Sequence, residues 1–598
     1  MFIKVLELMG TSEQQAKWLE PANRGQINGA YVQTELGHGT FVRGIETRAV
    51  FDAERDGFVI NTPTLSATKF WPGALGYSAT HGIIMARLII GGGGGGDSSC
   101  SKGQDYGVHA FMMQLRDIET GRAFPGITLG DIGPKLNHNQ NDNGYARFDG
   151  VFVPRANMLA AQAFVSRDGT FAKAPGVHDK AAYGTMMVTR SKMTWSTGLQ
   201  LAAAITVAVR WSTVREQGNF AFADDGEKKY GKPQEVALIN FRSQHYRLLT
   251  SLSKAYAMLF SSRHCEAVRG KFEERKQKYG DYSTMGAAHA LIGGVKAWCA
   301  HEATEGAEDA RRTCGGQGYL STSGMPDIVQ TLAITCTGEG DTHVLYQQTA
   351  RFLMKWALGW TLRPEVDVTK TNIPEDLRYL AELPRTSASL GDLSNLDTQL
   401  AIFRTRAQRV VARAASKVAQ EIRAGVDKPK AWNKHIMILM AAAKAHVEYI
   451  ILREFVGAVT KVTSSSEDRA ICVVMYRLCA LFALTTMTGE SGGGGGGGGS
   501  GPSFLEDAAL VPARLGEARE LISRLLDELL PDAIGLTDAW DFTDGCLCSA
   551  IGRYDGDAYA TLMRWTEQLP INVTARANDG VHTESWTRFI RPTLKSKL

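Results

Sequence analysis

The sequence predicts a multidomain α+β protein in which one β domain is followed by two all-α domains. With 598 residues the chain is too long for a single hydrophobic core. Apolar residues alternate with period two between about residues 27 and 170, whereas helical periodicity prevails from about residue 180 onward. A stretch that carries Pro and Asp, 364–396, divides the helical part in two.

The β domain, residues 27–170, is predicted from short strands and turn signals. TRAVFD and GFVINT flank a turn that ends in Asp56-Gly57, and VHAFMMQL follows at residue 108. YARF and VFVP stand on either side of Asp149-Gly150, which predicts a β-hairpin there. The first 26 residues look helical.

The helical part is predicted as one α domain over 171–363, a linker over 364–396 and a second α domain over 397–598. Two poly-Gly tracts, 91–96 and 492–499, interrupt this plan. Neither has the Gly-Lys-Ser/Thr ending or the strand and helix of a phosphate loop, so both are interpreted as flexible loop insertions.

Composition excludes several classes of function. Hydrophobic residues make up 44% and charged residues 21%, and a net charge of +4 gives no reason to expect nucleic acid as a partner. The nine cysteines are scattered without metal-ligand spacing, which indicates a reducing compartment and no zinc site. The most apolar stretches are short or contain Arg477, so they are predicted to be buried helices rather than membrane spans.

The chain ends in Ser596, Lys597 and Leu598. A C-terminal Ser-Lys-Leu is read by a receptor as the address of the peroxisome. An ordinary basic tail is the alternative interpretation.

The hexapeptide CTGEGD, 336–341, places two carboxylates ahead of a long apolar helix. Asp341 is predicted to cap this helix, because helical periodicity resumes at Val344. Glu339 lies between Gly338 and Gly340, which let a ligand approach the backbone and leave the carboxylate unshielded. Glu339 is therefore a candidate catalytic base, with a solvated turn residue as the alternative.

Two segments of the predicted β domain could hold a bound group. AYVQTELGHGT, 30–40, offers hydroxyl and backbone N–H donors, and His38 within it is expected to be a loop histidine that makes one hydrogen bond. In KFWPGALG, 69–76, a flat conjugated cofactor could lie against Trp71 and meet the backbone at Gly73. Either segment could equally be a structural loop.

Taken together, these motifs resemble those of the peroxisomal acyl-CoA oxidases, in the acyl-CoA dehydrogenase superfamily. The resemblance rests on QTELGHGT, the WPG turn, FVPRANML, CGGQGY, TGEGD followed by QTARFLMK, and the terminal SKL, in the order of the family. It implies an acyl-CoA dehydrogenase-like fold with a β-barrel-like middle domain followed by two helical-bundle domains. It also implies an FAD-dependent enzyme of fatty acid β-oxidation.

The resemblance assigns chemistry to particular residues. Glu339 would remove the α-proton of a fatty acyl-CoA thioester while the β-hydrogen leaves as hydride to FAD, giving a trans-2-enoyl-CoA; oxygen would then be reduced to hydrogen peroxide. Thr34 would lie at the edge of the flavin ring and Gly73 would contact the flavin through its backbone, with Trp71 nearby.

Arg215, Gly315 and Gly316 match positions that in the superfamily reach the FAD of the neighbouring subunit, so the resemblance implies a homodimer. It also implies a peroxisomal import receptor as a partner. Gly338 and Gln317 depart from the family pattern, which usually has an aromatic residue and a histidine there. Residues 1–26 resemble the end of the family's N-terminal helical domain, most of which the sequence lacks.

Two alternatives to the oxidase stay open at this point. One is an acyl-CoA dehydrogenase that passes electrons to another acceptor. The other is a non-catalytic homologue that binds flavin or acyl-CoA.

Overall fold

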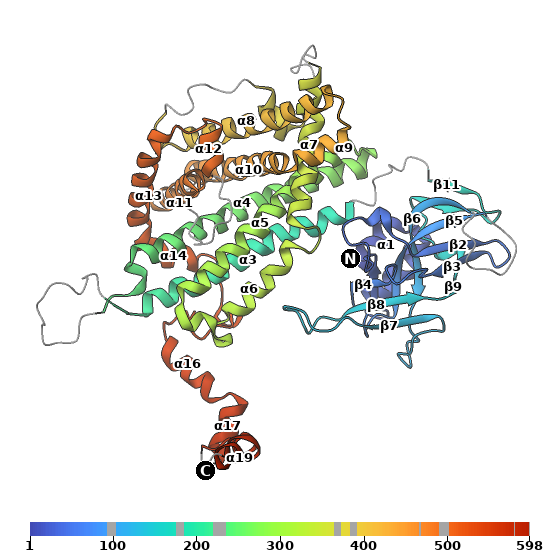
Figure 1. Ribbon diagram of the computed structural model, residues 1–598, viewed down its shortest axis with the longest axis horizontal. Coiled ribbons are helices and arrows are strands. Elements are labelled where there is room, and N and C mark those ends of the chain that lie inside the picture. Colours follow the sequence, from blue (N-terminus) through green and yellow to red (C-terminus); the bar gives the residue numbers. More distant parts are fainter. Residues whose placement is uncertain are drawn as a thin grey trace, which may run out of the picture. The chain divides into compact units, whose positions relative to one another are not determined.

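The structure is a computed structural model that describes residues 1–91, 103–174, 184–218, 235–363, 372–382, 391–465, 468–489, 501–578 and 580–596. The chain divides into two compact units, Met1–Thr189 with Glu274–Tyr282, and Arg190–Glu273 with Ser283–Leu598. Apart from Gly91, both poly-Gly tracts lie outside the described residues. Figure 1 shows the strands of the first unit in blue and cyan.

The strands found in the described residues all belong to the first unit. They are β1 (Gly29–Val32), β2 (Arg48–Asp52), β3 (Gly57–Asn61), β4 (Lys69–Gly73), β5 (His81–Ile90), β6 (Gln104–Gln114), β7 (Ile127–Asp131), β8 (Asn143–Phe148), β9 (Val151–Pro154), β10 (Ala163–Val165) and β11 (Phe171–Lys173). The six-stranded sheet has the order β1-β5-β2-β3-β9, with β6 also paired to β5. A second sheet has the order β4-β8-β7, and β10 pairs with β11.

The predicted turn at Asp56-Gly57 is confirmed, whereas the hairpin predicted at Asp149-Gly150 is wrong. Strands β2 and β3 pair antiparallel across the turn that ends in Asp56-Gly57. Strands β8 and β9, on either side of Asp149-Gly150, belong to different sheets. The reason is that β8 is paired on both edges, with β4 and with β7, and so has no free edge for β9, which pairs with β3.

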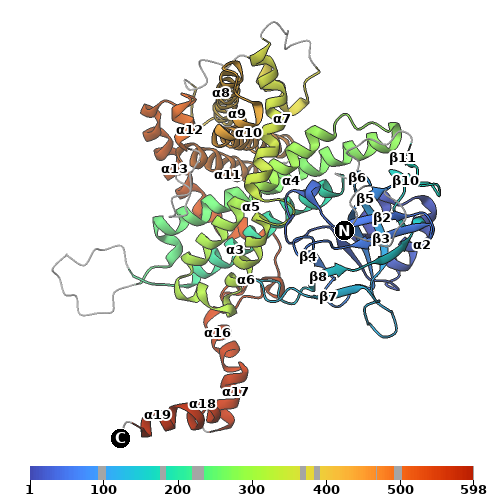
Figure 2. The same ribbon diagram turned by 45° about the vertical axis from the view of Figure 1, so that its right-hand side comes forward.

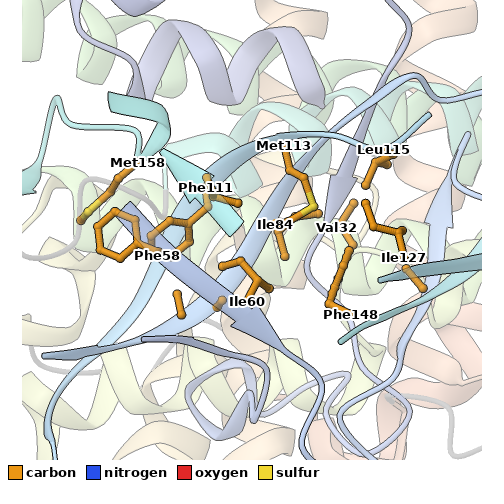
Figure 3. Close-up of a cluster of buried hydrophobic side chains, with 14 of the residues drawn as sticks. Val32, Phe58, Ile60, Ile84, Phe111, Met113, Leu115, Ile127, Phe148 and Met158 are labelled. Carbon is orange, nitrogen blue, oxygen red and sulfur yellow. The ribbon is translucent and has the colours of Figure 1, made fainter. Parts of the chain in front are cut away.

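Alternate side chains of β5 are buried in two different hydrophobic clusters, one on each face of the sheet. Ile84, Ala86 and Leu88 belong to the main cluster of the β domain, part of which is drawn in Figure 3. Ile83 and Met85 point to the opposite face and pack with α1 (Phe2–Met9) and α2 (Ser12–Asn23). The predicted helical start of the chain is thus confirmed, and its apolar face is buried on the sheet.

The second unit is built from helices. The helices from residue 184 onward are α3 (Gly184–Val214), α4 (Arg242–Tyr279), α5 (Met285–Thr313), α6 (Met325–Ala333), α7 (Thr342–Leu362), α8 (Leu396–Arg423), α9 (Lys428–Lys434), α10 (Ile436–Ser465), α11 (Arg469–Thr488), α12 (Gly501–Glu506), α13 (Leu515–Leu529), α14 (Ala533–Asp538), α15 (Asp544–Leu547), α16 (Ala558–Glu567), α17 (Pro570–Ala577), α18 (Thr583–Ser585) and α19 (Arg591–Lys595). The helical segments predicted from periodicity are confirmed.

Helix α5 carries the site described below and is buried along most of its length, from Ala288 through Ala310. It packs against α6, α7 and α10, while α8 and α10 lie side by side in Figures 1 and 2. Helix α11 is long and apolar enough to cross a membrane, but 56% of its most apolar window is buried inside the protein. The side chains in its second half, from Leu478 onward, are mostly buried in the hydrophobic core, as predicted for this apolar stretch.

Candidate active site

The loop that carries Glu339 joins a short 3-10 turn, Ile334–Cys336, to helix α7. Asp341 is the N-cap of α7, because its carboxylate accepts hydrogen bonds from the N–H groups of His343 (2.9 Å) and Val344 (3.2 Å). The predicted cap is confirmed. Glu339 itself has φ 57°, a left-handed conformation that side chains other than glycine adopt only when their surroundings hold them there.

Two buried cations hold this conformation. The ammonium of Lys296, on α5, donates to the carbonyls of Gly338 (2.8 Å) and Gly340 (2.7 Å). The guanidinium of Arg190, on α3, donates from Nε to the carbonyl of Glu339 (2.8 Å). Lys296 and Arg190 are 1% and 7% exposed, so three consecutive carbonyls of the loop are bound from the protein interior.

Burial dominates the electrostatics of both cations. It lowers the pKa of Lys296 to about 8, and the nearby Arg190 charge acts in the same direction. Burial also lowers the pKa of Arg190, an effect that the charge of Glu339 opposes.

The Glu339 side chain is half-buried. Within the described residues its carboxylate makes no hydrogen bond or ion pair, and its backbone N–H has no acceptor. The loop therefore presents a carboxylate and an N–H donor from the same residue, both unpaired within the described part of the chain.

In the first unit, the structure brings Thr34, Trp71 and Gly73 onto adjoining segments. The N–H of Phe70 donates to the carbonyl of Thr34 (2.9 Å), which places the second residue after β1 beside β4. The Thr34 hydroxyl has no hydrogen-bond partner among the residues that the structure describes.

A buried ion pair beneath these segments was missed by sequence reasoning. Lys69 is fully buried and donates to the Glu35 carboxylate (3.0 Å), while Thr47 donates to the same carboxylate through N–H and hydroxyl. Burial opposes the ionisation of Glu35, but the Lys69 charge and the Thr47 hydrogen bonds outweigh it and lower the pKa. His38 is bonded to Glu35 through Nδ1 (3.0 Å), as expected for a loop histidine.

Trp71 and Gly73 leave room for a flat ring. The pairing of β4 with β8 is irregular between Phe70 and Gly73, and Trp71 has φ 86°. The Trp71 side chain is 47% exposed, although large aromatic side chains are usually mostly buried. A methyl group placed on Gly73 would meet no atom closer than 4.0 Å. An exposed aromatic face, a bare stretch of backbone and a hydroxyl that is unpaired among the described residues fit the flavin of FAD.

Arg215, Gly315 and Gly316 lie in the second unit. Arg215 follows α3 and donates to the hydroxyl of Tyr559 (3.1 Å). The two glycines are exposed, and a methyl group on either would meet no atom within 4 Å. They follow the end of α5, about 27 Å along the helix from Lys296 at 1.5 Å per residue. Within one chain they do not join the Glu339 loop.

The comparisons with known proteins agree with this architecture. The family model "Acyl-CoA oxidase, C-alpha1 domain" matches residues 183–354, and the model "Acyl-CoA oxidase" matches residues 395–595. The peroxisomal acyl-coenzyme A oxidase 1 of Mus musculus is 36% identical over the whole chain, which covers 84% of the mouse protein.

Solved structures show the same fold. Acyl-CoA oxidase 1 of Arabidopsis thaliana has a TM-score of 0.86 and 32% identity over the whole chain, which covers 84% of that protein. Acyl-CoA oxidase-2 of Caenorhabditis elegans, bound with FAD, ascaroside-CoA and ATP, has a TM-score of 0.86 and 34% identity, and the chain covers 82% of it.

The fold class is therefore acyl-CoA dehydrogenase-like, as predicted. The chain belongs to the acyl-CoA oxidase family. The predicted enzyme class and peroxisomal localisation are confirmed.

Proposed function

We propose that in this acyl-CoA oxidase the Glu339 carboxylate removes the α-proton of a fatty acyl-CoA, and that molecular oxygen is the final electron acceptor. The enzyme is FAD-dependent. One observation carries the proposal for Glu339: its carboxylate is unpaired within the described residues, on a loop whose carbonyls are held by buried cations.

The chemistry needs this arrangement because an α-proton is far less acidic than a carboxylic acid. A base that is already paired with a cation would be a weaker base, whereas the Glu339 carboxylate is free to accept the proton. As the proton leaves, negative charge develops on the thioester oxygen, and the unpaired N–H of Glu339 can donate to it. When bound, FAD supplies the acceptor for the β-hydride.

In the proposal, three residues of the first unit contact the flavin. The free hydroxyl of Thr34 donates or accepts at the ring edge, the exposed face of Trp71 covers the ring, and the backbone at Gly73 approaches it. The C. elegans oxidase that shares this fold is bound with FAD, which supports a flavin role for these segments.

The proposal includes a homodimer in which Arg215, Gly315 and Gly316 contact the FAD of the neighbouring subunit. The distance along α5 supports it, because these glycines do not reach the Glu339 loop of their own chain. Co-expressing Glu339→Gln with Arg215→Ala tests it. Random assembly makes about half of the dimers mixed, and in each mixed dimer one site of two is intact, so about one quarter of the wild-type activity should return. Activity that stays at the level of the single variants, in dimers shown to be mixed, contradicts the assignment.

The proposed import signal is the final tripeptide. Ser596 is exposed, and Lys597 and Leu598 lie outside the described residues. Removing residues 596–598 should leave peroxide formation unchanged and abolish import into peroxisomes.

Hydrogen peroxide release from the FAD-loaded protein tests the reaction. Medium- and long-chain acyl-CoAs are added in air with no other electron acceptor. Peroxide formed in proportion to enoyl-CoA supports the oxidase. Flavin bleaching without peroxide would identify a dehydrogenase that uses another acceptor, and no bleaching would identify a non-catalytic homologue.

A further inference from the structure

We propose that Lys296 is a positioning residue for the reaction, one that aims the N–H of Glu339 at the thioester oxygen of the substrate. The inference rests on the proposed role of Glu339 and adds a second residue to it. Its starting point is that one ammonium, on the middle of α5, binds the carbonyls on both sides of Glu339, those of Gly338 and Gly340.

Peptide geometry connects the Gly338 carbonyl to the Glu339 donor. The peptide group is planar and trans, so its C=O and N–H point in opposite directions. The group that joins residues 338 and 339 directs its oxygen at the Lys296 ammonium, 2.8 Å away, in the protein interior. The Glu339 N–H must therefore point away from Lys296, where it has no acceptor among the described residues.

The second contact fixes the conformation of the base. Glu339 at φ 57° and Gly340 at φ 113° turn the chain so that the carbonyl of Gly340 returns to the same ammonium, 2.7 Å away. Arg190 binds the carbonyl between them. With both neighbouring carbonyls on one cation, the Glu339 backbone cannot rotate without breaking a charge-assisted hydrogen bond.

The charge of Lys296 also acts on the donor. A cation at the carbonyl oxygen polarises the whole peptide group and makes its N–H a stronger hydrogen-bond donor, most effectively where water is excluded. Lys296 is 1% exposed, so its field at this peptide is weakly screened.

Within the described residues no carboxylate pairs directly with Lys296, which points to function rather than stability. The buried lysines Lys69 and Lys254 each contact a carboxylate, that of Glu35 and that of Glu302 respectively. Lys296 has no carboxylate within ion-pair distance in the described part of the chain, only carbonyls. A buried cation without a direct ion pair is costly, and an apolar side chain would fill the place at less cost. Its presence is explained if the peptide it holds takes part in the reaction.

The test uses the FAD-loaded full chain and the substitution Lys296→Met. The carbonyl stretching frequency of a bound 3-thiaacyl-CoA, labelled with carbon-13 at the thioester, reports polarisation, because this analogue cannot lose hydride from its β position. The band is also read in Glu339→Gln, which cannot remove the α-proton, so that polarisation is separated from deprotonation. In the wild type the band should shift to lower frequency on binding. In K296M most of that shift should be lost, and kcat should fall about 10- to 100-fold with KM changed less than about threefold.

Matched variants separate the possible results. Lys254→Met removes a buried lysine of the same unit away from the loop, and should leave the carbonyl band unchanged. Glu339→Gln keeps the backbone N–H, so its band should shift as in the wild type. If K296M fails to bind FAD, Lys296→Gln, a shorter neutral donor, should give an intermediate shift.

A wild-type shift that persists in K296M or Lys296→Gln overturns the role of Lys296 and leaves Glu339 as the base. No shift in the wild type overturns both assignments, because the loop would then not contact the thioester. Loss of the shift in K254M would show that destabilisation alone explains the effect.

Discussion

Two loops of this protein each place a glutamate near a buried lysine, and the lysines contact different atoms. In the first unit Lys69 binds the carboxylate of Glu35 directly. In the second unit Lys296 binds the carbonyls on either side of Glu339, and the carboxylate is left unpaired within the described residues. The comparison teaches that a lysine on the carboxylate makes a glutamate structural, whereas a lysine on the backbone holds the loop and keeps the carboxylate available.

The largest expected effect is on turnover. Glu339→Gln removes the base, and we expect kcat to fall about a thousandfold, within the range for loss of a general base. FAD content and thermal unfolding should stay near the wild-type values, since the side chain has no partner to lose among the described residues. Activity within tenfold of wild type would falsify the assignment of Glu339 as the catalytic base.

Glu35→Gln should have the opposite effect: it should lower the stability of the fold and leave turnover largely unchanged. It leaves the Lys69 ammonium buried without a charge partner, and we expect a loss of about 3–5 kcal/mol in the free energy of unfolding. Turnover per bound FAD should be retained. Chemical denaturation of the variant measures the loss, and Glu35→Gln with Lys69→Met should recover part of it because the orphaned charge is then gone.

A third carboxylate extends the comparison to acid stability. Burial opposes the ionisation of Glu302, but Lys254, at 2.7 Å, and Lys444 outweigh it and lower the pKa to about 2. A lowered carboxyl pKa stabilises the folded state above its ordinary value of 4.5, and this contribution disappears as the pH falls toward 2. The free energy of unfolding of the wild type, measured by chemical denaturation, should therefore exceed that of Glu302→Gln by about 3 kcal/mol above pH 4.5. The gap should close toward pH 2; a gap independent of pH would exclude this linkage.

The smallest expected effect is at the other carboxylate of the loop. Asp341→Ala removes the cap of α7 and should cost about 0.5–2 kcal/mol of stability. Turnover should change much less than in Glu339→Gln, two residues away. Asp341→Asn, which can still cap the helix, is the control and should restore most of the stability.

Local signals in the sequence predicted much of this molecule. The turn that ends in Asp56-Gly57, the helical periods and the cap at Asp341 depend on neighbouring residues, and all of them are confirmed. The motif order identified the family, and with it a role for Glu339 that stays a prediction.

The parts that sequence reasoning missed depend on residues far apart in the chain. Lys296 lies 42 positions from Gly338, and Arg190 lies 149 positions from Glu339. Lys69 and Glu35 are 34 positions apart. No local spacing marks such pairs, and a lysine in an apolar helix gives no sign of which carbonyl it will bind. The Asp149-Gly150 hairpin failed for a related reason. Strand β8 pairs with the early strand β4 as well as with β7, and β9 pairs with the early strand β3.

That turn also constrains the order in which the β domain can assemble. Strand β8 completes one sheet and β9 completes the other, and only two residues separate them. Until this segment leaves the ribosome, β3 and β4 both lack a neighbour that they have in the finished protein. A nascent chain that stops before residue 143 therefore exposes unsatisfied edges of β3, β4 and β7 at once, a state that favours chaperone capture or aggregation over partial folding. Arrival of the turn would then close both sheets in a single late event, and long-range closure of this kind is slow.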